Sequence, residues 1–119
     1  MRNVYGVLAC GIIALGVLHM ASTPRVLTSS AVWFFSGGMA MVMTGALNLL
    51  NRRYGGTAPG LRWVCVATNA AMTAFTLVAG SVGRAGIGGL AITGGWVGAT
   101  TVFSLMAGAI GAARNKDAA

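Results

Sequence analysis

The stretch VYGVLACGIIALGVLHMA, residues 4–21, contains no acidic, lysine or arginine side chain and is almost long enough to cross a lipid bilayer as one helix. A helix needs about 20 mainly apolar residues to span a hydrocarbon core of about 30 Å. Apolar stretches of this kind recur along the chain, and we expect spans at residues 4–21, 30–50, 61–82 and 86–113. The sequence therefore predicts a single all-α membrane domain covering residues 1–119, with four antiparallel transmembrane helices in a bundle.

The composition supports this class of protein. Of the 119 residues, 56% are hydrophobic and only 8% are charged, and the mean hydropathy is +0.79. A soluble domain carries about 25% charged residues. The two cysteines, Cys10 and Cys65, lie inside apolar spans without a CxxC pair. We therefore expect both thiols to be small buried hydrophobes and not parts of a disulfide framework or a zinc site.

The basic residues indicate how the chain is oriented. Seven of the eight lie between or outside the apolar spans, Arg62 is the second residue of the third span, and the net charge is +7. With four antiparallel spans, six of the eight fall on one side of the membrane and two on the other. The six are Arg2, Arg52, Arg53, Arg62, Arg114 and Lys116, and the two are Arg25 and Arg84. Cytoplasmic loops of membrane proteins are rich in Lys and Arg, so we expect both termini in the cytoplasm. The Ala, Gly and Arg-rich composition favours a bacterial inner (cytoplasmic) membrane, and the dispersed charges argue against a nucleic-acid partner.

Small residues recur at helical spacing in several spans. In a bilayer such residues let helix backbones approach closely, as in the GxxxG motif. Gly94 and Gly98 form a GxxxG pair in the fourth span, and Gly38 and Gly45 share a face of the second. We predict a similar face on the first span, formed by Gly6, Cys10 and Ala14. These faces indicate packing within the bundle, and their number favours a homo-oligomer as well.

The third span has the most polar face. Cys65, Asn69, Thr73 and Thr76 follow one another at helical spacing, and Asn48 lies at a similar depth in the second span. Polar groups turned toward lipid would lose their hydrogen bonds, so we expect this stripe to face the interior. An Asn48–Asn69 hydrogen bond is expected between the two helices. The stripe serves either as a helix-packing contact or as the lining of a solute path.

Apart from Arg62 at the very start of the third span, the spans contain no Asp, Glu, Lys or Arg. Proton-coupled transporters and voltage sensors depend on such groups inside the membrane, and catalysis needs an acid, base or activated nucleophile. We therefore predict a protein that is not an enzyme and that works through helix–helix contacts, as a self-assembling unit or as an accessory subunit of a membrane complex. Its partners would be the lipid bilayer, further copies of itself and other membrane subunits. The alternative is a small oligomeric channel or facilitator for a neutral, lipophilic or anionic solute.

A further alternative is a soft-metal or haem site formed by His19, Met20, Met39 and Met43. Thioether and imidazole groups suit Cu(I), and His and Met are axial ligands of haem iron. The order of Met39-xxx-Met43 and Gly94-xxx-Gly98 is similar to that in the high-affinity copper transporters, although the number of spans differs. We expect no cofactor, and the leading interpretation of His19 is an interfacial polar residue at the end of the first span.

Overall fold

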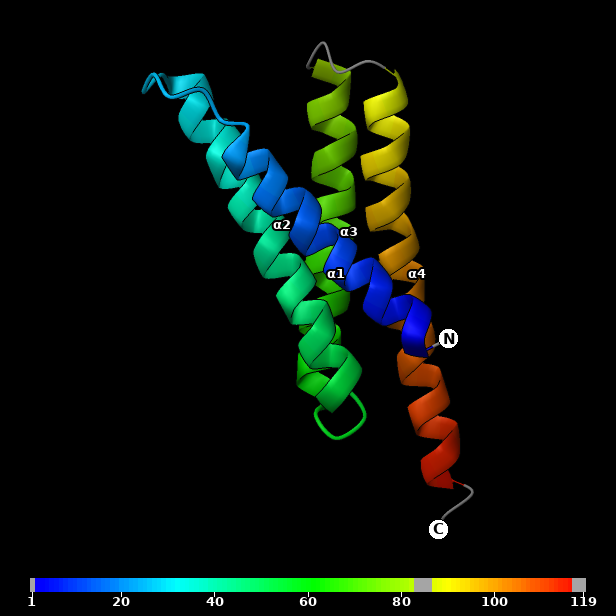
Figure 1. Cartoon of the computed structure of the whole chain (residues 1–119). Helices are drawn as coiled ribbons and strands as arrows, with labels where there is room; N and C mark the ends of the chain where they lie inside the picture. The colour runs from blue at the N-terminus through cyan, green and yellow to red at the C-terminus, as the bar shows by residue number, and fades with distance from the viewer. Residues whose placement is uncertain (1, 83–86, 117–119) are drawn as a thin grey trace.

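The structure is a computed structural model that describes residues 2–82 and 87–116, and its described residues form four helices (Figure 1). The helices are α1 (Arg2–Ala21), α2 (Ser29–Tyr54), α3 (Pro59–Val82) and α4 (Ile87–Lys116). The all-α prediction is confirmed. The first three helices cover the spans predicted for them and extend beyond them by a few residues at one or both ends. The fourth helix covers its predicted span from Ile87 onward. Arg84 and the predicted first residue of that span, Gly86, lie outside the described residues.

Local sequence explains where the helices begin and end. The Thr23 hydroxyl donates to the His19 carbonyl oxygen at 3.3 Å, an acceptor that the end of α1 leaves free. The Ser22 hydroxyl donates to the Leu18 carbonyl oxygen at 2.8 Å, which also accepts from the Ser22 amide at 2.9 Å. Thr28 caps α2, because its hydroxyl accepts from the Ala31 amide at 3.2 Å. Pro59 is the first residue of α3, where its missing N–H costs no hydrogen bond.

Close backbone approach holds α1 against α2. A Cβ atom added to Gly38 would lie 2.8 Å from the Gly16 carbonyl oxygen, and one added to Gly45 would lie 2.8 Å from the Ala9 carbonyl oxygen. These distances are shorter than real Cβ contacts, so only glycine permits this packing at either position. The predicted small face of α2 is thus in contact with α1.

The predicted face of α1 is wrong in part. Gly6 is buried, but Cys10 and Ala14 are exposed. The buried face instead runs through Tyr5, Ala9, Ile12 and Gly16. The expectation of two buried cysteines is therefore wrong for Cys10. Small residues occur on more than one side of this helix, so their spacing alone does not identify the side that packs.

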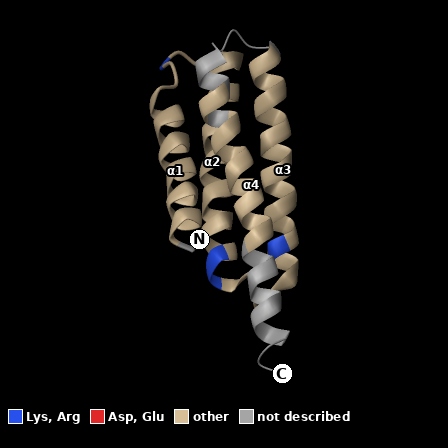
Figure 2. Ribbon diagram, turned by 90° about the vertical axis from the view of Figure 1, so that its right-hand side faces the viewer, with Lys and Arg blue, Asp and Glu red and all other residues tan. Residues whose placement is uncertain are grey.

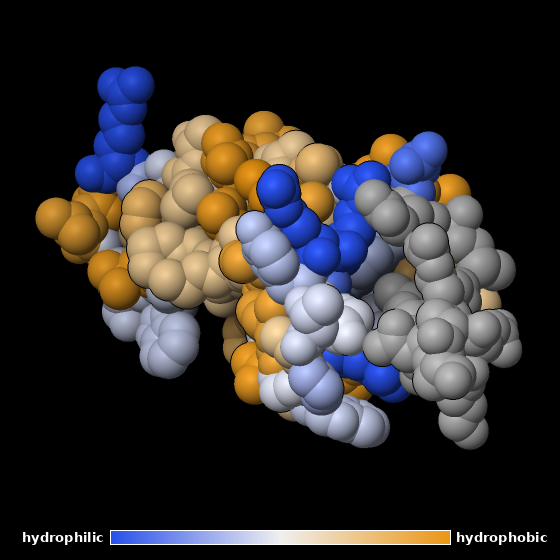
Figure 3. Space-filling model, turned by 90° about the horizontal axis from the view of Figure 1, so that it is seen from below, coloured by the Kyte–Doolittle hydropathy of each residue, from blue (hydrophilic) through white to orange (hydrophobic). Residues whose placement is uncertain are grey.

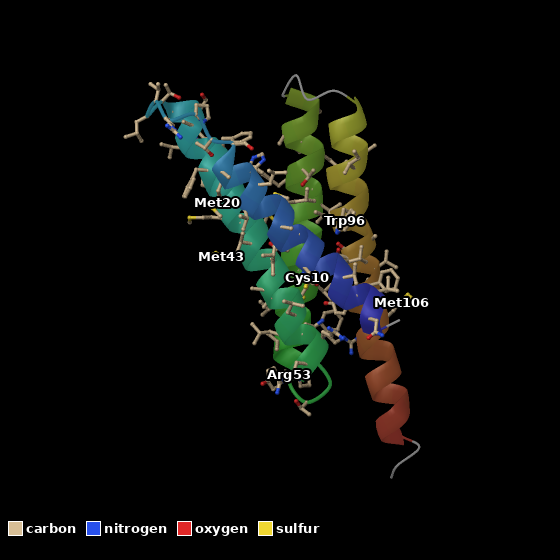
Figure 4. All side chains as sticks on the ribbon, viewed as in Figure 1. Cys10, Met20, Met43, Arg53, Trp96 and Met106 are labelled. Carbon is tan, nitrogen blue, oxygen red and sulfur yellow. The ribbon has the colours of Figure 1, made fainter. Side chains whose placement is uncertain are left out.

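Trp96 connects α4 to α1. Its indole Nε1 donates to the Leu8 carbonyl oxygen at 3.0 Å, and its ring packs directly on Gly11 (Figure 4). Next to this contact lies a small apolar core with members from all four helices: Ile12 and Leu15, Met41, Met72, and Trp96 and Val97.

The molecule is elongated, with extents of 58 × 24 × 21 Å. Within residues 2–82 and 87–116, three helices are long and apolar enough to cross a membrane, over Asn3–Ala21, Ser29–Tyr54 and Pro59–Ser81. Large apolar side chains cover their outer surfaces, among them Leu18, Phe75 and Val78. Arg52, Arg53 and Arg62 lie where α2 ends and α3 begins, whereas Arg25 lies in the α1–α2 loop (Figure 2).

Candidate functional site

The main functional candidate is a buried polar cluster, formed by Tyr5 of α1, Asn48 and Asn51 of α2, and Cys65 and Asn69 of α3. None of the five side chains is more than 5% exposed, and those of Asn48, Cys65 and Asn69 are fully buried. Polar groups avoid such positions unless other polar groups satisfy them. The cluster therefore ties three helices together at the α2–α3 end of the molecule.

The two central amides form a reciprocal pair. Asn48 Nδ2 donates to Asn69 Oδ1 at 2.8 Å, and Asn69 Nδ2 donates back to Asn48 Oδ1 at 2.9 Å. The second Asn48 Nδ2 hydrogen goes to the Thr44 carbonyl oxygen at 2.8 Å. The contact expected between Asn48 and Asn69 is thus present, and both amides use their donors and acceptors within the protein.

Tyr5 brings α1 into the cluster. Its hydroxyl donates to Asn48 Oδ1 at 2.7 Å and accepts from Asn51 Nδ2 at 3.0 Å. The Cys65 thiol lies 3.3 Å from Asn48 Oδ1 and 3.7 Å from the Tyr5 hydroxyl. Three donors therefore converge on the Asn48 carbonyl oxygen, which makes this residue the centre of the cluster.

A line of polar groups continues from the cluster between α3 and α4. The Thr73 hydroxyl donates to the Asn69 carbonyl oxygen at 2.8 Å and lies 3.3 Å from the Thr101 hydroxyl. Thr100 and Ser104 are fully buried, and each donates to a carbonyl oxygen of α4. Thr76 donates to Met72 in its own helix. These hydroxyls satisfy themselves locally, as Thr and Ser do in apolar helices.

The groups of this interior are uncharged amides, hydroxyls and a thiol. They donate and accept hydrogen bonds, and asparagine amides neither supply nor remove protons at ordinary pH. Among the described residues, no three His, Cys, Asp or Glu side chains come together in a way that suits a metal ion. The chemistry that this arrangement offers is directional hydrogen bonding between helices.

The residues considered for copper or haem have different surroundings. The His19 ring stacks on Phe34, with centroids 3.6 Å apart and ring planes at 22°. Met20 packs against Gly38 at the α1–α2 contact. Met39 and Met43 are 43% and 68% exposed, so their thioethers lie on the outer side of α2. His19 thus contacts an aromatic ring, while the two α2 methionines lie at the surface.

The glycines of α4 differ from those of α2. A Cβ atom on Gly94 would make only an ordinary contact with Leu77, at 3.8 Å, and one on Gly95 or Gly98 would meet no described atom within 4 Å. Together with Ala91, Val102 and Leu105, Gly95 and Gly98 form what we call the outer stripe of α4. This stripe is open, whereas Gly38 and Gly45 are closed against α1.

Comparisons with known proteins complete the description of the site. No protein-family model, curated protein or solved structure matches the chain. The interpretation of the cluster and of the outer stripe therefore rests on their geometry.

Two members of the cluster were not expected from the sequence. The only signal for Tyr5 is its position near the start of an apolar helix, which is equally typical of an aromatic residue at the membrane interface. Asn51 lies at the polar end of α2, beside two arginines, where an exposed amide is the ordinary expectation. A count of hydrogen-bond partners for Asn48 would have shown that one asparagine cannot satisfy it alone.

Proposed function

We propose that this chain is an integral membrane protein without catalytic activity that works through helix–helix contacts, either with copies of itself or as an accessory subunit of a larger membrane complex. We further propose four antiparallel spans with both termini in the cytoplasm of a bacterium. The supporting charge asymmetry is that Arg52, Arg53 and Arg62 lie at the α2–α3 end and Arg25 at the opposite end. Basic residues favour the cytoplasmic side of the membrane.

The open outer stripe of α4 is the observation that carries this proposal. Glycine inside a helix costs about 1 kcal/mol relative to alanine. On α2 the close contact with α1 offsets that cost, whereas Gly95 and Gly98 make no comparable contact with the described residues. Small residues give their benefit in a bilayer when a second helix lies against them. A helix from another polypeptide is the partner that fits.

The test compares leucine substitutions at two surface positions. Gly98→Leu closes the outer stripe, and Ala70→Leu adds similar bulk to an exposed position of α3. Copies labelled with donor or acceptor dyes are combined in liposomes, and energy transfer is measured as unlabelled chain is added. We expect energy transfer for the wild type and for Ala70→Leu, and its loss for Gly98→Leu.

A complex with other subunits is tested by purification in mild detergent. In that case the wild type co-purifies with a reproducible partner, and Gly98→Leu releases it. A monomer without partner under the mildest conditions contradicts the proposal. So does an equal effect of Ala70→Leu, because the contact would then not be specific to α4.

A conduit for a neutral solute is the second candidate, favoured by the line of polar groups from Asn69 through Thr73 to Thr101. Replacing both threonines by valine removes these hydroxyls while keeping side-chain shape and the Asn48–Asn69 pair. If the line is a path, Thr73→Val/Thr101→Val abolishes solute flux into liposomes without changing the oligomer. Unchanged flux removes this candidate.

A further inference from the structure

Two half-buried arginines at the α2–α3 end have no acidic partner among the described residues. The guanidinium group of Arg52 lies directly on Gly6 of α1, where any Cβ atom would displace it. The Arg62 Nε atom is buried and meets no hydrogen-bond acceptor in the described part of the chain. The single acidic residue of the sequence, Asp117, lies outside the described residues.

Both arginines lie close in sequence to members of the buried polar cluster that contact the Tyr5 hydroxyl of α1. Arg52 follows Asn51, whose amide donates to the Tyr5 hydroxyl. Arg62 lies one turn before Cys65, whose thiol is 3.7 Å from the same hydroxyl. Arg52 thus flanks the buried polar cluster on α2, and Arg62 flanks it on α3. Figure 3, seen from below, shows hydrophilic side chains gathered at this end, with hydrophobic ones around them.

The neighbouring aromatic residues indicate the depth of this end in a membrane. Tyr54 and Trp63 are 47% and 61% exposed, and they follow Arg53 and Arg62 in the sequence. The Arg62 guanidinium carbon lies 5.5 Å from the centre of the Trp63 ring. Exposed Tyr and Trp side chains of membrane proteins lie at the level of the lipid headgroups. The two half-buried arginines therefore lie at the level of the lipid phosphates.

Charge also favours an anion at this position. A cation that is partly removed from water is costly unless an opposite charge or hydrogen-bond acceptors compensate it. The amino ends of α1 and α3 lie at the same end and add positive potential. Guanidinium groups bind phosphate through paired charge-assisted hydrogen bonds. We propose that Arg52 and Arg62 bind the phosphate group of one anionic phospholipid.

The experiment measures lipid retained by the purified full-length chain in mild detergent, by native mass spectrometry. The probes are phosphatidylglycerol and phosphatidylcholine with identical acyl chains. We expect the wild type to retain one phosphatidylglycerol in preference to phosphatidylcholine. Arg52→Gln and Arg62→Gln each reduce this preference about fivefold. Arg53→Gln is the matched control, because Arg53 is exposed and adjoins Arg52 in sequence, and it leaves the preference unchanged.

A second variant separates position from charge. Gly6→Leu displaces the Arg52 guanidinium while preserving the net charge, and we expect it to reduce the preference as much as Arg52→Gln. Equal retention of the two lipids by the wild type overturns the proposal, as does an equal loss with Arg53→Gln. If millimolar inorganic phosphate releases the bound lipid, the site is assigned to free phosphate, and the lipid is overturned as the source.

Discussion

Replacing Asn48 by alanine is the most direct test of the buried polar cluster, because the Asn48 amide is its centre. The substitution removes the hydrogen bond from Tyr5 and both bonds of the pair with Asn69. It also removes the contact from the Cys65 thiol. Tyr5 belongs to α1 and Asn69 to α3, so one substitution loosens two helix–helix contacts.

The expected magnitude follows from the number of bonds lost. Interhelical hydrogen bonds in a bilayer contribute about 0.6–1.7 kcal/mol each, and the three strong bonds of Asn48 to other helices measure 2.7, 2.8 and 2.9 Å. Their loss lowers the free energy of unfolding by about 2–5 kcal/mol. The upper part of this range is favoured because the Tyr5 hydroxyl and the Asn69 amide stay buried without Asn48, and orphaned groups carry their own penalty.

The assay is reversible unfolding of the purified chain in mixed micelles, with a denaturing detergent as titrant and helix content as signal. Ser36→Ala is the control, since the exposed Ser36 hydroxyl bonds only to carbonyl oxygens of its own helix. We expect the control to change the free energy of unfolding by less than about 0.5 kcal/mol. The two single variants remove the same pair of bonds, so their effects should not add. The Asn48→Ala/Asn69→Ala double variant should lower the free energy of unfolding by less than the sum of the two single variants, with a difference of at least about 1 kcal/mol. A cost for Asn48→Ala no larger than that of the control, or simple additivity, would refute the reasoning.

Three further predictions use the same unfolding assay. Gly38→Leu should lower the free energy of unfolding by at least about 1–3 kcal/mol, because a side chain there forces α1 away from α2; no change would show that the close contact contributes nothing. Trp96→Phe keeps the ring on α1 but removes the bond to the Leu8 carbonyl oxygen, and should cost about 1 kcal/mol; an unchanged stability would contradict this role of the indole. Cys65→Leu overfills a fully buried site and should cost about 1–3 kcal/mol, whereas Cys10→Leu at an exposed site should cost less than about 0.5 kcal/mol; equal costs would contradict the assignment of the buried face of α1.

The sequence indicates the Asn48–Asn69 contact because polar residues in an apolar helix have few acceptable positions. An amide facing lipid would lose its partners, so two asparagines at similar depth in neighbouring helices are expected to meet. Tyr5 and Asn51 carry no such constraint, since both lie near helix ends where water and headgroups are available. Only the packed structure shows that they are buried.

The face of α1 could not be predicted from small residues, for a physical reason. In a soluble helix the apolar side marks the core, but in a bilayer the outer surface is as apolar as the interior. Small residues then remain the main signal, and on α1 they occur on more than one side. Cys10 is accordingly exposed, while Ala9, its neighbour in sequence, is buried.

Hydropathy also fails to predict where a helix ends, as α2 shows. The second span was expected to end at residue 50, but α2 continues to Tyr54. Hydropathy marks the width of the hydrocarbon core, whereas a helix continues as long as its backbone hydrogen bonds are made. The added turn contains Asn51 and Arg52, and it therefore supplies a member of the buried polar cluster and a proposed phosphate ligand.

Directional bonds explain why an apolar chain of this kind keeps polar groups in its interior. Apolar helix surfaces in lipid gain little from one another beyond close packing, and many rotations of a smooth helix pack about equally well. The reciprocal amide pair of Asn48 and Asn69 forms only when α2 and α3 have one rotation and one relative height, and the Tyr5 hydroxyl imposes the same condition on α1. Gly38 and Gly45 then allow α1 to lie close enough to α2 for these bonds to form. The glycines thus provide proximity and the amides provide register. The open stripe of α4 has small residues of the same kind, but no described atom lies against Gly95 or Gly98.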